Sequence, residues 1–389
     1  MIPINRNLDP LERSGIRVFT NLAKATPDCR MLTIGEPDLP TPEPVKQAAF
    51  RSLSRDETHY APNQGTASLR AAIAAFETAR GRNTTPEEVL VTVGATQALY
   101  TALTGILNPG DQVIIPTPAF SLYATIVTAA GAEPVFLDVS GTDFQITEEA
   151  LSACLTERTR AIVLNSPCNP TGVILHKKSL DTVARAVFGK NIYLICDNVY
   201  NQLVYAPCGD LTRREELRSQ TILCQSFSKP YAMTGWRLGY AVGPRPVIAA
   251  MSAYQSHATG NPCSVAQYAG LAALTGDQSC VSDMVQAFAR RRDVLVACAR
   301  EIDGVTFFDP KGAFYLLLNI SPAIGRRYHG QMIENSLDFA QLLLTHQHVS
   351  IIPGDAFGAK NCCRISYTRS EDVIREAMAR IRAFINELD

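Results

Sequence analysis

One lysine, Lys229, stands between small polar residues and a proline in the stretch QSFSKP, and Arg237 follows it eight residues later in GWR. The apolar run TILCQSF before it predicts a buried strand, and Pro230 disfavours the α conformation at the preceding residue. We therefore expect Lys229 on a loop at a strand end. An amine placed there could bond covalently to a carbonyl carbon and move protons, which are tasks that an ordinary surface lysine does not perform.

Other candidate residues follow the ends of further predicted strands. Each has an ordinary structural interpretation when it is taken alone, because NPTG forms turns, an aspartate after a strand caps helices, and a phenylalanine fills cores. In parallel sheets, however, ligands gather beyond the carboxyl ends of the strands. Taken together, the residues therefore predict a binding site: Gly94, Ala95, Thr96, Phe120, Asn169, Asp197, Tyr200 and Ser226.

Pyridoxal 5′-phosphate is the cofactor that requires this set of groups. Lys229 would bond its aldehyde carbon, and Asp197 would hold its ring nitrogen protonated, because an opposite charge stabilises the charged form. Asn169 and Tyr200 would donate hydrogen bonds toward its phenolic oxygen. The phosphate would be held by N–H groups at the start of the helix after Gly94 and by Thr96, Ser226 and Arg237. Once substrate had freed the lysine, its amine would move the substrate α-proton.

The elements that must position these residues alternate between strand-like and helix-like segments. Nearly continuous apolar runs recur in the middle of the chain, at residues 111–116, 133–139, 160–167, 191–197, 221–227 and 237–243. Strands that are apolar on both sides are covered on both faces of their sheet. The pattern therefore predicts an α/β fold with a mostly parallel, doubly wound sheet.

The pattern changes near residue 281, where a long helical segment rich in Ala and Arg begins, followed by short strands and a terminal helix. We expect three segments. Residues 1–45 form an N-terminal arm that is part of a small domain, residues 46–280 form the large cofactor-binding domain, and residues 281–389 form the small α+β domain.

Composition limits the class of partner. The 389 residues carry a formal net charge of −1, without a basic stripe, which disfavours nucleic-acid binding. No apolar run approaches the length of a membrane span, and the first residues lack the apolar core of a signal peptide. Eleven cysteines without CxxC pairs suit a reducing compartment. We therefore expect a cytoplasmic protein that acts on small molecules, with no membrane partner and no metal.

An ordered series of motifs resembles the class I/II (fold-type I) pyridoxal-phosphate aminotransferases of the aspartate/aromatic type. The motifs span nearly the whole chain: GEPDLPTP, HYAPNQG, GATQAL, PTPAF, SPCNPTG, DNVY, SFSK, GWR, PKGAFY, PGDAFG and RISYTRS. The resemblance implies the roles given above for Lys229, Asp197, Asn169 and Tyr200. It also implies that Ala95, Thr96, Ser226 and Arg237 bind the phosphate and that Phe120 stacks on the cofactor ring.

The same resemblance supplies the substrate contacts and the assembly. Arg364 would bind the substrate α-carboxylate, because a guanidinium matches a carboxylate with two parallel hydrogen bonds. Gly35 would offer its backbone N–H to that carboxylate, Asn169 would lie beside it, and Asn165 would support them. Tyr60 would reach the phosphate in the neighbouring subunit, which implies a homodimer with shared active sites.

Two positions depart from the family pattern. Asn198 stands where an acidic residue is frequent, and Thr96 stands where some aspartate-using relatives carry a lysine that binds the distal carboxylate. The segment QSHATGNPCS resembles one that approaches the side-chain pocket across the dimer. Its residues His257, Thr259 and Asn261 are pocket candidates, although a loop and cap role explains them equally well.

The implied activity is transfer of an amino group from an L-amino acid to a 2-oxo acid, with 2-oxoglutarate as the expected acceptor, by a ping-pong mechanism. The donor is left open among aromatic, aspartate and neutral amino acids. Apolar pocket candidates tilt the expectation slightly toward aromatic or broad specificity; they are Ile16, Phe120, Phe314 and Phe357. Two alternatives remain at this point, a C–S β-lyase on the same fold and a non-catalytic cofactor-binding or regulatory protein.

Overall fold

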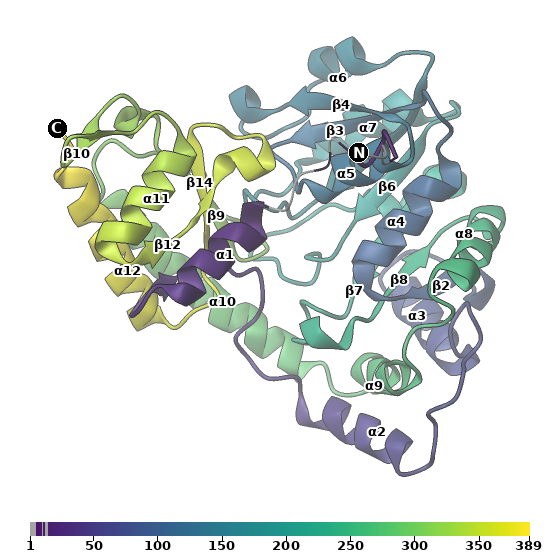
Figure 1. Ribbon diagram of the computed structural model, residues 1–389. Coiled ribbons are helices and arrows are strands. Elements are labelled where there is room, and N and C mark those ends of the chain that lie inside the picture. Colours follow the sequence, from purple (N-terminus) through teal and green to yellow (C-terminus); the bar gives the residue numbers. More distant parts are fainter. Residues whose placement is uncertain (1–4, 10, 12–14) are drawn as a thin grey trace.

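The computed structural model describes residues 5–9, 11 and 15–389. Its main sheet has seven strands in the order β2-β8-β7-β6-β5-β3-β4 (Figure 1). The strands from β7 to β4 run parallel, whereas β8 is antiparallel to both β7 and β2. The strands are β2 (Val89–Thr92), β3 (Gln112–Thr117), β4 (Glu133–Asp138), β5 (Thr159–Asn165), β6 (Tyr193–Asp197), β7 (Thr221–Ser226) and β8 (Gly239–Val242).

Helices cover both faces of this sheet (Figure 1). Because neighbouring residues of a strand point to opposite faces, Val113 and Val163 pack with α4, α5 and α8, while Ile114 and Ile162 pack with α6 and α7. Burial on both sides explains the continuous apolar runs and confirms the predicted α/β class. The helices over the sheet are α3 (Ala67–Ala79), α4 (Gly94–Ile106), α5 (Leu122–Ala129), α6 (Glu148–Cys154), α7 (Lys177–Val187), α8 (Arg245–Ala258) and α9 (Ser264–Thr275), and α2 (Glu43–Leu53) packs on the outside of α9.

A smaller group of elements lies beside the main sheet (Figure 1). Its antiparallel sheet has the order β13-β14-β9 and shares one core with α10, α11 and α12. Two further pairs of short strands are β1 with β12 and β10 with β11. The elements are β1 (Arg30–Met31), α10 (Ser279–Arg300), β9 (Tyr315–Asn319), β10 (Arg327–Tyr328), β11 (Gln331–Met332), α11 (Ser336–Gln347), β12 (Val349–Ser350), β13 (Ile352–Pro353), β14 (Cys362–Ser366) and α12 (Glu371–Asn386).

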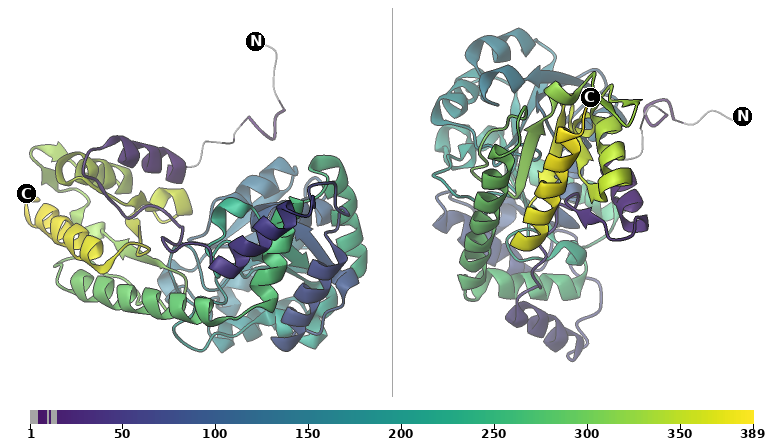
Figure 2. Two further views of the ribbon diagram at one scale, coloured as in Figure 1. Left: turned by 90° about the horizontal axis from the view of Figure 1, so that it is seen from below. Right: turned by 90° about the vertical axis from the view of Figure 1, so that its left-hand side faces the viewer.

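The N-terminal segment contains a helix, α1 (Gly15–Ala25), which the sequence did not lead us to expect. Phe19 of α1 and Leu32 enter the core of the smaller group. Figure 2 shows α1 lying on that group, after which the chain crosses to α2 beside α9, and the long helix α10 extends back. Part of the predicted arm lies outside the described residues, and the domain boundaries near residues 45 and 280 stay a prediction.

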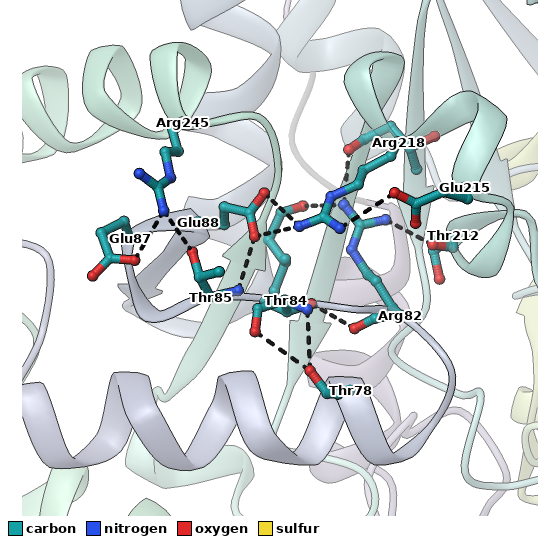
Figure 3. Close-up of polar contacts among 12 residues, drawn as sticks. Thr78, Arg82, Thr84, Thr85, Glu87, Glu88, Thr212, Glu215, Arg218 and Arg245 are labelled. Atoms are coloured by element: carbon teal, nitrogen blue, oxygen red, sulfur yellow. Dashed lines mark hydrogen bonds and ion pairs between the residues drawn. The ribbon is translucent and has the colours of Figure 1, made fainter.

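A polar network fastens the edge of the main sheet (Figure 3). Nη2 of Arg218 donates to both carboxylate oxygens of Glu88, at 2.9 and 2.8 Å. The buried Arg82 donates to the carbonyl oxygens of Thr212, at 2.9 Å, and Thr221, at 3.2 Å. These contacts join the start of β2 to the segment that leads into β7. They therefore fix the two strands that flank β8, which begins just after the GWR motif.

Candidate active site

A cavity of about 510 Å³ lies beyond the carboxyl ends of β5, β6 and β7, and β9, β14 and α1 close its other side. Its size suits a cofactor together with a small substrate. The supporting residue Asn165 lines it. It also brings together most of the residues predicted for the site: Gly35, Ala95, Thr96, Phe120, Asn169, Asp197, Tyr200, Ser226, Lys229, Arg237 and Arg364. Of the other candidates, Gly94, Phe314 and Phe357 do not line it.

Lys229 lies on the loop that follows β7, as its neighbours predicted. Its Nζ donates a hydrogen bond to the backbone oxygen of Gly35 at 2.5 Å. Burial lowers the pKa of the Lys229 amine to about 8; Glu36 opposes this shift, while Arg364 and Arg237 add to it. A substantial fraction of the amine is therefore neutral near physiological pH, which is the form that attacks carbonyl carbons and accepts protons.

Asp197 ends β6 and is buried. The Tyr123 hydroxyl donates to its Oδ2 at 2.6 Å, and the Val199 N–H donates to its Oδ1 at 3.4 Å. Burial raises the pKa of Asp197 to about 6, and the hydrogen bond from Tyr123 opposes that rise. A carboxylate in this position gains most from a cationic partner that enters the cavity. Tyr123 was not among the predicted residues, because a tyrosine three residues after Phe120 gives no signal beyond ordinary core packing.

Asn165 joins the ends of two neighbouring strands. Its side-chain amide donates to the backbone oxygen of Asp197 at 2.8 Å, and its Oδ1 accepts from the Asn169 N–H at 2.8 Å. The turn that carries Asn169 is thus held at a fixed position beside β6. This arrangement agrees with the supporting role expected for Asn165.

The start of α4 and Arg237 form a group of anion-binding donors. The first N–H groups of a helix have no intrahelical partner, and those of Ala95 and Thr96 belong to residues that line the cavity. Arg237 lies so close that a Cβ on Gly94 would be 2.7 Å from its Nη2. Residue 94 also has a φ of 71°, a backbone conformation that favours glycine. With the buried Ser226, these groups offer the N–H, O–H and guanidinium donors that bind phosphate.

Arg364 is buried in β14, at 2% exposure. Its Nη1 donates to Oδ1 of Asn169 at 2.9 Å, and its Nη2 donates to the backbone oxygen of Thr33 at 2.7 Å. Its Nε has no hydrogen-bond partner among the described residues. A buried cation without an anionic partner is costly. The arrangement therefore suits a site where a carboxylate arrives from solution.

Tyr315 connects these groups, although it was not predicted as a site residue. Its hydroxyl lies 2.9 Å from the hydroxyl of Tyr200, and its ring centroid lies 4.4 Å from Cζ of Arg364. A Cβ on Gly35 would collide with the Tyr315 hydroxyl. Tyr315 thus contacts groups expected on the cofactor side and on the substrate side. Its place in PKGAFY was the available signal, but an aromatic residue at the start of a buried strand is equally explained by core packing.

Several candidates do not enter the cavity of their own chain. Tyr60 is 99% exposed. His257, Thr259 and Asn261 do not line the cavity, and Thr259 instead accepts from Nε2 of Gln97 at 2.5 Å. The side chain of Ile16 lies outside the described residues. Asn198 is buried and donates to Oδ2 of Asp210 at 3.2 Å.

Metal ions and membranes are two further kinds of partner that a chain can bind. Among the described residues, no group of three or more His, Cys, Asp or Glu side chains is placed to hold a metal ion. None of the helices in the described part of the chain is both long enough and apolar enough to span a membrane.

Comparisons with known proteins agree with this arrangement. Residues 27–381 match the family model of aminotransferase class I and II. The chain is 41% identical over 370 residues to the aspartate/prephenate aminotransferase of Cereibacter sphaeroides, covering 93% of this chain and 92% of that protein. It is 38% identical to the aspartate aminotransferase of Geobacillus stearothermophilus, covering 91% of this chain and 90% of that one.

Solved structures give the same result. The aspartate aminotransferase of Rhizobium meliloti superposes with a TM-score of 0.93 at 36% identity, over 100% of both chains. That of Thermus thermophilus, solved with maleate, has a TM-score of 0.92 at 35% identity and covers 99% of this chain and 100% of that one. All of these relatives are named as aminotransferases, which does not favour the β-lyase or the non-catalytic alternative. The chain therefore belongs to the class I and II aminotransferases and acts as an aminotransferase.

Proposed function

We propose that the cavity binds pyridoxal 5′-phosphate and that the enzyme moves the amino group of aspartate to 2-oxoglutarate. The aspartate preference is supported by the names of the relatives, which outweigh the slight tilt toward aromatic or broad specificity drawn from Ile16, Phe120, Phe314 and Phe357. When bound, this cofactor withdraws electrons from the substrate α-carbon and so makes its proton removable. The protein must then hold both molecules and move that proton.

The chemistry of the donor set fits this cofactor. Lys229 supplies the amine for the aldehyde, and the buried Asp197 supplies a carboxylate for the ring nitrogen. The hydroxyl of Tyr200 and the amide of Asn169 lie at the same cavity and suit a phenolic oxygen. Phe120 offers a ring face. The phosphate matches the remaining donors, which are the start of α4, Ser226 and Arg237.

The observation that carries the proposal is the unpaired Nε of Arg364 in a buried position. A substrate carboxylate would complete its hydrogen bonds and neutralise its charge. That contact would place the α-carbon within reach of the Lys229 amine, which accepts and returns the proton. Closure of the smaller group and α1 over the cavity would exclude water.

Product analysis tests the proposal. With aspartate and 2-oxoglutarate, the purified enzyme loaded with cofactor should form oxaloacetate and glutamate in equal amounts. A cysteine conjugate should not yield pyruvate and ammonia at a comparable rate. Release of those two products without a requirement for 2-oxoglutarate would support the β-lyase instead.

The lowered pKa of Lys229 predicts a pH dependence of cofactor loading. Because only the neutral amine attacks the aldehyde, loading of the cofactor-free protein should accelerate about tenfold per pH unit and level off above a pH of about 8. An ordinary lysine with a pKa of 10.5 would give a rise that continues to much higher pH. Stopped-flow absorbance across this range measures the rate, and a continued rise above pH 9 to 10 would contradict the assignment.

Tyr315 should act as a positioning residue. Tyr315→Phe removes one hydroxyl partner of Tyr200 and keeps the ring over Arg364, so we expect kcat to fall about three- to tenfold with little change in KM. Tyr315→Leu removes the ring as well and should also raise KM for the amino acid. Steady-state kinetics of both variants separate the two effects, and equal changes in KM would contradict these separate roles.

The assembly, the domain division and the location are also proposals. We infer a homodimer in which Tyr60, fully exposed in one chain, completes the site of the partner. Sedimentation of the purified enzyme tests this, and a fully active monomer would contradict it. We also propose that the large and small domains meet near residues 45 and 280, and the cysteine content supports a cytoplasmic location.

A further inference from the structure

One basic side chain at the cavity is not needed for the cofactor or for the α-carboxylate. Among the described residues, four basic side chains line the cavity: Lys24, Lys229, Arg237 and Arg364. The last three are assigned to the aldehyde, the phosphate and the α-carboxylate. Lys24 is left over, and it could not be selected from the sequence, because it lies in a segment expected to be an arm.

The position of Lys24 follows from α1. Thr20 and Lys24 are four residues apart on this helix, and both line the cavity, so one face of α1 is turned toward it. Lys24 is exposed, and its side chain makes no hydrogen bond or ion pair with the described part of the chain. It stands in the last turn of a helix that packs on the smaller group through Phe19.

The acidic side chains at the cavity do not neutralise Lys24. Asp197 is buried at the end of β6 with Tyr123. Glu36 is exposed at the cavity and interacts electrostatically with Lys229. Thr96, which lines the cavity from the start of α4, is exposed and uncharged. Lys24 is therefore the one basic group of the described lining that is available to a second anionic group of the substrate.

We propose that Lys24 determines specificity by binding the side-chain carboxylate of a dicarboxylic substrate. This inference rests on the proposed aminotransfer from an acidic amino acid and names the residue that selects it. An ammonium is a compact charge on a flexible stem, unlike the planar guanidinium of Arg364. The flexible Lys24 side chain can therefore bind carboxylates on substrate side chains of different lengths. We expect the binding of aspartate, glutamate and 2-aminoadipate to depend on Lys24.

Substitution of Lys24 by methionine in the cofactor-loaded enzyme tests this, because it keeps an unbranched side chain, one atom shorter, and removes the ammonium with its charge and N–H donors. We expect kcat/KM for aspartate and glutamate to fall about tenfold, as for a partly exposed ion pair with a ligand. kcat/KM for phenylalanine should not change. Maleate is a dicarboxylate without an amino group. Its Kd, measured by calorimetry, should rise by the same factor in Lys24→Met. Lys24→Arg should retain most of the kcat/KM for aspartate and glutamate and most of the affinity for maleate.

Lys178→Met is the matched control, since Lys178 is an exposed lysine on α7 that does not line the cavity. It should alter neither kcat/KM nor the Kd for maleate. The proposal is overturned if Lys24→Met leaves both the aspartate preference and the maleate Kd unchanged, or if it weakens phenylalanine as much as aspartate. Failure of the proposed function is a different result, in which the unsubstituted enzyme forms no glutamate from aspartate and 2-oxoglutarate.

Discussion

Replacement of Lys229 by alanine should reduce kcat by about 10²–10⁴-fold or more while the protein remains folded, because the proposed mechanism uses that amine as the general base and acid for the α-proton. The loss of folding stability should be small, because the substitution removes one hydrogen bond, which Lys229 donates to the Gly35 oxygen. Steady-state assays with aspartate and 2-oxoglutarate measure kcat, and thermal unfolding by circular dichroism measures the fold.

Lys229→Arg is the sharper control. It retains a cation near Phe314, whose ring centroid lies 5.8 Å from the Lys229 Nζ, but a guanidinium does not lose its proton in proteins. We expect this variant to be as inactive as Lys229→Ala. Normal turnover by either variant would refute the role of Lys229, whereas unfolding of Lys229→Ala alone would leave Lys229→Arg to decide.

Replacement of Arg364 by alanine should have the second large effect, on substrate binding. Loss of one partner of a buried charged hydrogen-bond pair costs about 2–5 kcal/mol, so kcat/KM for aspartate should fall by roughly 30-fold to several thousand-fold. The variant also leaves the Thr33 oxygen and Oδ1 of Asn169 without their donor. Some loss of thermal stability is therefore expected beside the kinetic effect.

Arg364→Lys separates the two contributions. It keeps the charge but not the paired N–H geometry, so it should recover only part of the lost kcat/KM. The binding of maleate and of an amine without a carboxylate should be compared in all three proteins. If Arg364→Ala weakened the simple amine as much as the dicarboxylate, the guanidinium would be structural and would not bind the substrate carboxylate.

More of the candidate site residues could be predicted from the sequence than of the strand directions and helices that hold them. Lys229 and Asp197 could be placed at strand ends, because apolar runs followed by polar residues predict that edge of a parallel sheet. The antiparallel direction of β8 could not be predicted, because the apolar pattern of a strand carries no information about its direction. Helix α1 was missed because the short proline-rich motifs near it favoured an irregular arm.

Contacts between segments that are far apart in the chain could not be predicted from a single sequence. The bond from Arg364 to Asn169 joins β14 to the turn after β5, and only the packing of the smaller group on the main sheet brings them together. Tyr123 and Tyr315 were missed for a related reason, because a buried tyrosine that holds a functional group looks like any core aromatic. Lys24 could not be selected either, because the segment around it was expected to be an irregular arm.

The most direct measurement of the central claim is the absorbance spectrum of the cofactor-loaded enzyme during addition of aspartate without an acceptor. The aldehyde form of the cofactor absorbs visible light and the amine form does not. We predict that the visible band disappears in proportion to the active sites, that one equivalent of oxaloacetate is released, and that 2-oxoglutarate restores the band. A protein that never acquires the visible band, or one that retains it while releasing pyruvate and ammonia from a cysteine conjugate, would contradict the account.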